Sequence, residues 1–535
     1  VKGCSLPYRL LNNNNIETFK IKDGLKIEST EKLNNPKSYT TYVTEPRKRI
    51  DDLEPMPSPY LNGLFDELLK NCKYDIEGTI ETTRGCPFGC TFCEIGTKYY
   101  QKIKTHGKAK IFREIDWLSD NKASFIYNAD SNFGMLPEHV SIAEYLVKKK
   151  KETGYPEKHR CDWAKVHGDK VIKIAKILFK SGMESGITIA LQSLNPATLE
   201  AVKRKNMDDG KLSEFLNKYN DDELASFTEI ILGLPEETYE TFSKGICKVI
   251  ELGQHDYVGI NELIALPNTP FGDPEYRKKY GLNLVETWPS FVHVDNSNKR
   301  DEVEQMVIGS NSMSVDDYKE SMMFKWLVLF GHYLGTIQYI ARFLRNYKNI
   351  GYYNFYNDLY NFIKNRKNGF LFNEYKETYN DTEKATIKKG PWGRVLDHIR
   401  SNFAWKFEEG TVIKISENKN IFYDELKIFL NNYNLDSNLL DELINFQIAG
   451  VLWPDENYEI VKEFSYNFLD VIINNNKLKE EKTRYLFNGK NFDNDIFTWA
   501  KEILWWGRKQ AECKTKITIV NPNRKIEVFE NPNNS

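Results

Sequence analysis

The chain of 535 residues is long enough for more than one domain and for a large buried core. Its 74 lysines and arginines nearly balance its 76 aspartates and glutamates, and the net charge of -2 carries no strong nucleic-acid signal and excludes a strongly acidic protein. Three of the eight cysteines cluster and the rest are scattered, a usage that argues against a secreted disulfide framework and favours the reducing cytoplasm.

The sequence also predicts no membrane-spanning segment. The most apolar helical stretch, 326–344, is interrupted by His332, Gln338 and Arg342, whereas a span needs roughly 18 or more apolar residues. No apolar core typical of a signal peptide stands near the N-terminus. Because the first residue is Val1 rather than Met, we expect that the natural start precedes it.

Residues 1–75 are expected to form an N-terminal connector without a core of its own. Short β-like pieces alternate there with Asn, Lys and Pro. Near its end, Pro55, Pro57 and Pro59 fall within five residues, and the fixed φ angle of proline predicts an extended path. The plain interpretation of this stretch is an inter-domain linker.

From residue 76 to residue 285, strand-like and helix-like segments alternate in the manner of parallel βαβ units. The predicted strands are 79–83, 124–128, 159–163, 186–191, 226–232 and 257–266. The predicted helices lie near 109–119, 136–151, 169–181, 196–204, 210–219 and 237–253. This pattern predicts an α/β fold, a partial (β/α)6 TIM-like barrel, with its chemistry at the carboxyl ends of the strands.

A cysteine loop, residues 84–93, follows the first predicted strand. Cys86, Cys90 and Cys93 have a C-x3-C-x2-C spacing, and three thiolates so close together favour a soft metal. A mononuclear zinc site usually takes a fourth protein ligand, for which His106 is the nearest later candidate. A four-iron cluster held by three cysteines instead keeps one iron open to a substrate or cofactor.

The spacing of these cysteines, with Phe92 just before the last of them, resembles the signature of the radical S-adenosylmethionine (SAM) superfamily. The resemblance implies a [4Fe-4S] cluster on Cys86, Cys90 and Cys93, with SAM chelating the open iron. An electron then cleaves SAM to methionine and a 5′-deoxyadenosyl radical. It also implies an external electron donor, such as flavodoxin or ferredoxin, and a small-molecule or peptide substrate.

The resemblance further assigns SAM contacts to several strand ends. Asp130 and Ser131 occupy the place of a Gly-Gly-Glu-like segment, although the residues differ. Gln192, Ser193 and the later Arg204 match positions that contact the ribose and carboxylate of SAM, and an Arg fork suits a carboxylate. For Arg204 the alternative is a solvated helix end.

Two turns beside the adenine are implied as well. The stretch 233–238 resembles a Gly-Leu-Pro-x-Glu-Thr turn, in which Gly233 would allow close backbone approach. Pro267 lies in a stretch similar to a Leu-Pro-x-Thr-Pro turn. Phe92 completes the cofactor-binding residues that the resemblance implies.

Four charged residues near strand ends are candidates for substrate contact or catalysis: Asp162, Lys165, Glu229 and Glu262. An apolar barrel interior does not accept charges without partners, so these side chains need an explanation. The alternative is that each has a purely structural role.

Residues 286–535 are expected to form a mainly α-helical C-terminal domain. Helical periodicity is strongest over 318–344, 352–363, 424–432, 438–446 and 495–506. The last residues, 522–535, predict a short strand and a polar tail.

The stretch 57–63, Pro-Ser-Pro-Tyr-Leu-Asn-Gly, resembles the linker of radical SAM enzymes that carry a cobalamin-binding domain. No Asp-x-His-x-x-Gly cobalamin motif occurs in the sequence, so that domain is expected before Val1. This branch implies a cobalamin-dependent methyltransferase. One alternative is a cobalamin-independent radical SAM enzyme that modifies a peptide, tRNA or small metabolite, and another is a non-catalytic zinc-binding interaction module.

Overall fold

The computed structural model describes residues 5–9, 39–43, 50–165, 168–184, 186–222, 224–288, 292–293, 302–505 and 514–520. The chain divides into two compact units, Val1–Pro57 and Ser58–Ser535. In the first unit, β1 (Ser5–Arg9) pairs antiparallel with β2 (Tyr39–Val43). The predicted tail at 522–535 and the predicted connector pieces at 10–38 lie outside the described residues.

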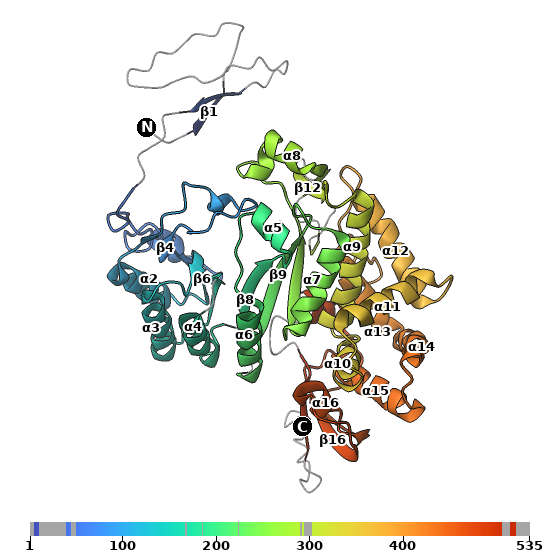
Figure 1. Ribbon diagram of the computed structural model, residues 1–535. Coiled ribbons are helices and arrows are strands. Elements are labelled where there is room, and N and C mark those ends of the chain that lie inside the picture. Colours follow the sequence, from blue (N-terminus) through green and yellow to red (C-terminus); the bar gives the residue numbers. More distant parts are fainter. Residues whose placement is uncertain are drawn as a thin grey trace. The chain divides into compact units, whose positions relative to one another are not determined.

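The second unit contains the predicted series of parallel strands (Figure 1). They are β3 (Glu77–Ile80), β6 (Phe125–Phe133), β7 (Lys158–Trp163), β8 (Ile187–Gln192), β9 (Ser226–Leu232) and β10 (Tyr257–Glu262). The strand orders β3-β6-β7 and β10-β9-β8 form two three-stranded parallel sheets. Strands β7 and β8 are neighbours without a ladder between them, so the described strands make an open, partial barrel as predicted.

Helices cover one face of these sheets. They are α2 (Lys108–Asp120), α3 (Glu138–Thr153), α4 (Asp169–Lys180), α5 (Pro196–Ala201), α6 (Asp209–Asp221) and α7 (Tyr239–Glu251). Burial alternates along β9, where Ile230 and Leu232 belong to the same core as Ile246 and Ile250 of α7. Side chains of a strand point alternately to opposite faces. Glu229 therefore lies on the inner face of the sheet, opposite to the face that α7 covers.

The first predicted strand, 79–83, is interrupted. After β3 the chain leaves the sheet at Glu81, and β4 (Thr83–Arg84) pairs antiparallel with β5 (Lys104–Thr105). This short ladder closes the base of the cysteine loop. A 3-10 turn, η1 (Glu94–Gly96), follows the last cysteine, and α1 (Asp66–Leu69) precedes the sheet.

The remainder of the second unit is largely helical. Its helices are α8 (Pro274–Tyr280), α9 (Val315–Val328), α10 (Gln338–Tyr347), α11 (Tyr352–Asn365), α12 (Phe370–Ala385), α13 (Phe407–Glu417), α14 (Lys419–Leu430), α15 (Ser437–Ala449), α16 (Phe468–Asn474) and α17 (Ile496–Trp499), with turns η2 (Pro270–Gly272), η3 (Leu329–Tyr333), η4 (Asn431–Tyr433) and η5 (Ala500–Trp505). Helices α9 and α11 both pack against α7, so the helical region and the barrel share one core.

Short antiparallel pairs complete the unit: β11 (Asn283–Thr287) with β12 (Glu304–Gly309), β13 (Arg394–Val395) with β14 (Ala404–Trp405), and a sheet of β15 (Ile460–Tyr466), β16 (Glu480–Asn488) and β17 (Lys516–Ile519). The sequence did not predict this last sheet. Much of β15 and β16 is exposed on both faces, so the alternation that marks a half-buried strand is weak there.

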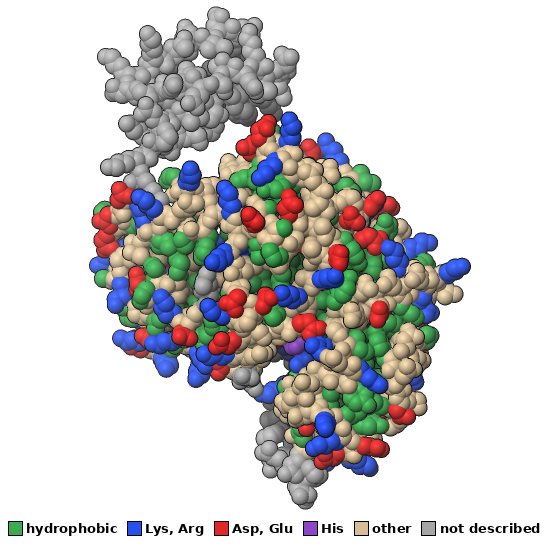
Figure 2. All heavy atoms as spheres, viewed as in Figure 1, with side chains coloured by type: hydrophobic (Ala, Val, Ile, Leu, Met, Phe, Trp, Pro, Cys, Tyr) green, Lys and Arg blue, Asp and Glu red, His purple; other side chains and the backbone are tan. Residues whose placement is uncertain are grey.

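Acidic and basic side chains are interspersed over the face of the molecule in Figure 2, in line with the near-zero net charge. None of the helices in the described residues has both the length and the apolar composition that crossing a bilayer requires.

Candidate metal centre

The cysteine loop is tightly packed against the chain that returns from it. Cys86 and Cys90 are each only 2% exposed, and Cys93 is partly buried. Gly85 has a φ angle of +109°, and a Cβ there would lie 2.6 Å from the carbonyl oxygens of Tyr100 and Lys102. Only glycine accepts both this conformation and this approach, so Gly85 sets the path of the loop.

A second glycine, Gly96, lies in the turn after the last cysteine, and the sequence motif does not reveal it. A Cβ at Gly96 would lie 2.3 Å from the carbonyl oxygen of Cys90, whereas at Gly89, which lies inside the loop, it would meet only an ordinary contact. The Gly96 amide donates to the carbonyl of Cys93 at 3.0 Å. The turn after the last cysteine therefore also depends on glycine.

Three donors from later parts of the chain approach the cysteine sulfurs. The side-chain amide of Asn132 donates to Sγ of Cys86 at 3.2 Å. The ammonium of Lys165 lies 3.9 Å from Sγ of Cys86 and 3.8 Å from Sγ of Cys90, and Nη1 of Arg204 lies 3.9 Å from Sγ of Cys90. Positive charge and hydrogen-bond donors stabilise thiolates, so this environment fits an anionic, thiolate-bound metal group.

The described residues do not complete a four-ligand zinc site at the loop cysteines. Tetrahedral zinc holds its sulfur ligands about 3.8 Å apart. Among the described residues, the metal-ligand atoms that gather within 4.8 Å of one another belong to His159, Cys161 and Glu184, and the loop cysteines do not form such a group. His106 lies 3.5 Å from Glu81 instead.

A small apolar cluster lies beside the turns that follow β9 and β10. It comprises Val202, Leu234, Leu263, Ala265, Phe271 and Val307, with Phe92 packed against it. Gly233, at the end of β9, has a φ angle of +101°, and a Cβ there would lie 3.0 Å from the Val307 carbonyl oxygen. Pro267 is exposed at the end of the β10 segment. Phe92 of the cysteine loop thus packs against residues that follow β9 and β10.

The residues at the end of β8 are held by side chains. Gln192 has the left-handed φ angle of +69°, which is strained for a residue with a Cβ. The Ser193 hydroxyl donates to Glu237 at 2.5 Å, and Thr241 donates to the other carboxylate oxygen of Glu237 at 2.5 Å. Burial raises the pKa of Glu237 above its usual value, and these hydrogen bonds only partly offset that increase. The sequence motif contains Glu237, but its link between Ser193, after β8, and Thr241, in α7, was not predicted.

Arg204 is buried against the same strand. Its guanidinium donates to the carbonyl of Ala190 and, at 3.0 Å, to Oδ1 of Asn206. The alternative of a solvated helix end is therefore wrong, since Arg204 is 7% exposed.

Asp130 points toward the chain that leads into the cysteine loop. Its Oδ1 accepts from the backbone amides of Thr82 at 2.6 Å and Thr83 at 2.8 Å, and its Oδ2 accepts from the Thr82 hydroxyl. Nε2 of the buried His139 lies 3.6 Å from Oδ2. This carboxylate orders the approach to the loop. Its neighbour Ser131 is partly buried.

The four charged candidates have different surroundings. Lys165 lies at the cysteine sulfurs, and its ammonium is 5.2 Å from the centre of the Phe88 ring. Asp162 is exposed and accepts from the hydroxyl of Tyr127 at 2.9 Å. Glu229 is partly buried on the inner face. Glu262 pairs with Lys325 of α9; burial would raise the pKa of Glu262, but this ammonium holds it below its usual range.

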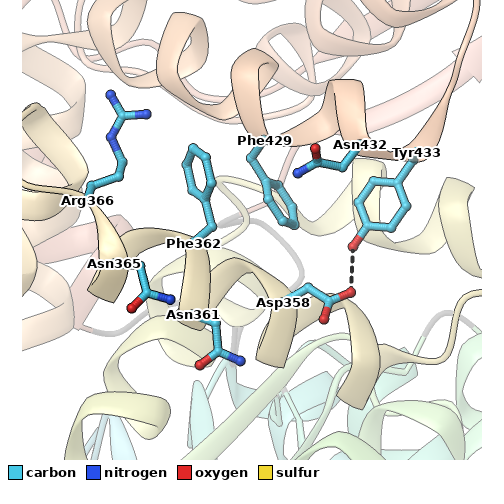
Figure 3. A pocket seen from close by; sticks show the side chains of 8 residues that line it. All are labelled: Asp358, Asn361, Phe362, Asn365, Arg366, Phe429, Asn432 and Tyr433. Carbon is cyan, nitrogen blue, oxygen red and sulfur yellow. Dashed lines mark hydrogen bonds between the residues drawn. The ribbon is translucent and has the colours of Figure 1, made fainter.

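A separate groove lies between α11 and the end of α14 (Figure 3). Amide, charged and aromatic side chains line it: Asp358, Asn361, Phe362, Asn365, Arg366, Phe429, Asn432 and Tyr433. The hydroxyl of Tyr433 donates to Asp358 at 3.4 Å. No predicted site residue is among them.

Comparison with known families agrees with this geometry. Residues 80–244 match the sequence model described as the Radical SAM superfamily, and they therefore form a radical SAM domain. Members of this superfamily use a [4Fe-4S] cluster and SAM, and they act with external reductants on small-molecule or peptide substrates.

Two curated relatives are more specific. The chain is 30% identical over 455 residues to the cobalamin-dependent radical SAM methyltransferase TokK of Streptomyces tokunonensis. The aligned region covers 80% of this chain and 65% of TokK. It is 32% identical over 320 residues to the 2-(S-pantetheinyl)-carbapenam-3-carboxylate methyltransferase of Streptantibioticus cattleyicolor, covering 59% of this chain and 46% of the relative. The chain thus spans only part of the length of both relatives.

Among solved structures, the radical SAM methyltransferase TsrM of Kitasatospora setae aligns with a TM-score of 0.31. The two chains are 18% identical over 37% of this chain and 38% of TsrM.

Proposed function

We propose that the protein is a radical SAM enzyme, and specifically a cobalamin-dependent methyltransferase. The observation that carries the proposal is the arrangement of Cys86, Cys90 and Cys93 beneath amide and cationic donors in a domain that matches the Radical SAM superfamily. The methyltransferase step rests on the 30% identity to TokK.

In this proposal Cys86, Cys90 and Cys93 hold a [4Fe-4S] cluster, which with SAM supplies the one-electron chemistry when bound. The protein's own residues bind and orient. Asn132, Lys165 and Arg204 offset the negative charge of the sulfurs. The apolar cluster around Phe92 excludes water beside the loop.

SAM would be held by the predicted residues at the strand ends: Phe92, Asp130, Ser131, Gln192, Ser193, Arg204, Gly233 and Pro267. Two residues of this set are already hydrogen-bonded within the protein. The carboxylate of Asp130 is occupied by Thr82 and Thr83, and the guanidinium of Arg204 by Ala190 and Asn206, which favours positioning roles for both. Gly233 lets the backbone approach the Val307 carbonyl closely beside the apolar cluster around Phe92.

Asp162 and Glu229 are the proposed substrate-side groups, because both lie on the inner face of the strands. Glu262, paired with Lys325, would instead fix α9 against β10. We further propose an electron donor such as flavodoxin or ferredoxin, a small-molecule or peptide substrate, and a cytoplasmic setting, since thiolates that bind iron require reducing conditions.

The proposal is tested by anaerobic reconstitution of the chain with iron and sulfide, followed by incubation with SAM and dithionite. We expect about four irons per chain and release of 5′-deoxyadenosine. Cys90→Ala should abolish both, whereas Cys72→Ala, which removes an exposed thiol outside the loop, should change neither. Zinc in place of iron, with intact SAM, would support the interaction module instead.

The methyltransferase assignment needs a second measurement, with and without added cobalamin. Release of S-adenosylhomocysteine that depends on added cobalamin supports methyl transfer. Formation of 5′-deoxyadenosine alone, with or without cobalamin, supports the cobalamin-independent alternative.

A further inference from the structure

A second group of metal-ligating side chains lies away from the cysteine loop, at the seam between the two parallel sheets. His159 and Cys161 are two residues apart on β7 and therefore point to the same face. Glu184 comes from the loop between α4 and β8, on the other side of the seam. Ligand atoms of the three residues all lie within 4.8 Å of one another.

The group is buried in the core. His159 is 2% exposed, Cys161 is 4% exposed, and the Glu184 side chain is 11% exposed. Nδ1 of His159 lies 3.7 Å from Oε2 of Glu184, which is about the separation of two ligand atoms on one zinc ion. The imidazole, thiol and carboxylate thus lie close enough together to be candidate ligands of one metal ion.

The imidazole of His159 has no hydrogen-bond partner at either ring nitrogen among the described residues. Leaving a buried polar group without a partner costs about 1–3 kcal/mol, so a core normally avoids it. An ion pair with Glu184 would engage only Nδ1 and would place a charged ring in the core with Nε2 still unsatisfied.

We propose that His159, Cys161 and Glu184 bind one zinc ion. One neutral imidazole, one thiolate and one carboxylate are ligands that zinc favours, and the two anionic ligands neutralise its charge of two. A neutral assembly avoids the cost of an uncompensated buried charge. Three protein ligands leave one position of the tetrahedron for water.

The zinc site would act as a structural staple. No ladder joins β7 to β8, and the described backbone contact across this seam includes the His159 amide, which donates to the Met183 carbonyl at 2.7 Å. A metal bound by His159 and Cys161 on one side and Glu184 on the other connects the two sheets. Because His159 is near the start of β7, the site lies toward the edge opposite to the cysteine loop.

The test removes the loop cysteines so that they cannot bind zinc themselves. The full chain carrying Cys86→Ala, Cys90→Ala and Cys93→Ala is purified without chelators, and its zinc is counted by mass spectrometry. We expect about one zinc per chain. Adding Cys161→Ala should lower the zinc content about tenfold. The matched control is Cys247→Ala, which removes another fully buried thiol, in α7, outside the metal-ligand group.

Cobalt substitution gives an independent measurement. Co²⁺ in the same cluster-free chain should show a thiolate charge-transfer band that Cys161→Ala abolishes and Cys247→Ala keeps. His159→Gln, with folding checked by circular dichroism, guards against a misfolded cysteine variant. The proposal is overturned if the cluster-free chain holds no zinc, or if Cys161→Ala and His159→Gln keep it. Neither result would affect the assignment of the cysteine loop.

Discussion

The side-chain amide of Asn132 donates a hydrogen bond to Sγ of Cys86 at 3.2 Å. Asn132 is near the end of β6, which pairs with β3, the strand that precedes the cysteine loop. Its Oδ1 accepts from the backbone amide of Lys165 at 3.4 Å. Asn132 thus ties Cys86 to the end of β7 as well as to β6.

Asn132→Asp keeps the acceptor but replaces the donor with a negative charge beside a thiolate. We expect the midpoint potential of the reconstituted cluster to fall by on the order of 50 mV, because a hydrogen bond to sulfur stabilises the reduced state. The potential is measured by a redox titration followed by electron paramagnetic resonance. Asn476→Asp, which adds the same charge at an exposed position outside the site, is the control, and an equal potential in both variants would contradict the role of Asn132.

Glu237 connects the residue that follows β8 with helix α7, because it accepts hydrogen bonds from Ser193 and Thr241. In Glu237→Gln an NH2 group replaces one of the two carboxylate oxygens. One of the hydroxyls of Ser193 and Thr241 then loses its acceptor. We expect the free energy of unfolding to fall by about 1–3 kcal/mol and the KM for SAM to rise, since the Gln192 turn loses its support. The measurements are urea unfolding and the rate of SAM cleavage. Glu236→Gln, at the exposed neighbouring position, should leave both unchanged.

Gly233→Ala tests the close approach beside the apolar cluster. The φ angle of +101° and the 3.0 Å distance to the Val307 carbonyl both oppose a Cβ. We expect a loss of about 1–3 kcal/mol in the free energy of unfolding, seen as a lower melting temperature. Gly168→Ala is the comparison, because a Cβ there meets nothing within 4 Å. Equal melting temperatures of the two variants would argue against a strained turn.

His139 should make the stability depend on pH. Burial lowers its pKa from 6.5 to about 4, so the unfolded ring binds a proton in this range that the folded ring does not. The stabilisation is complete above pH 6.5 and is lost as the pH falls toward 4, by up to about 3 kcal/mol.

The check is urea unfolding of the cluster-free chain at pH 7 and pH 5. His139→Gln, whose side-chain oxygen can accept from the Gly134 amide as Nδ1 of His139 does at 2.7 Å, should weaken the pH dependence. His398→Gln, which changes an exposed histidine, should preserve it. A pH dependence that survives His139→Gln would assign it to other groups.

Local patterns predicted much of the fold. Strand β9 has the bounds that alternation predicted, 226–232, and α4 begins at the predicted residue 169. The split of the first strand at Glu81 was missed, because a two-residue ladder has no period to detect. The domain boundaries at 75 and 285 and the SAM contacts stay predictions.

The sequence by itself determined the cysteine spacing, the βα alternation and the turns around Gly233, because these depend on residues close together in the chain. Only the tertiary structure decided that Asn132 reaches Cys86 across 46 residues, that Lys165 reaches it across 79, and that Glu184 meets His159 and Cys161 at the seam. Such contacts depend on how strands and loops pack side by side, and no periodicity of the sequence encodes which side chains then face one another.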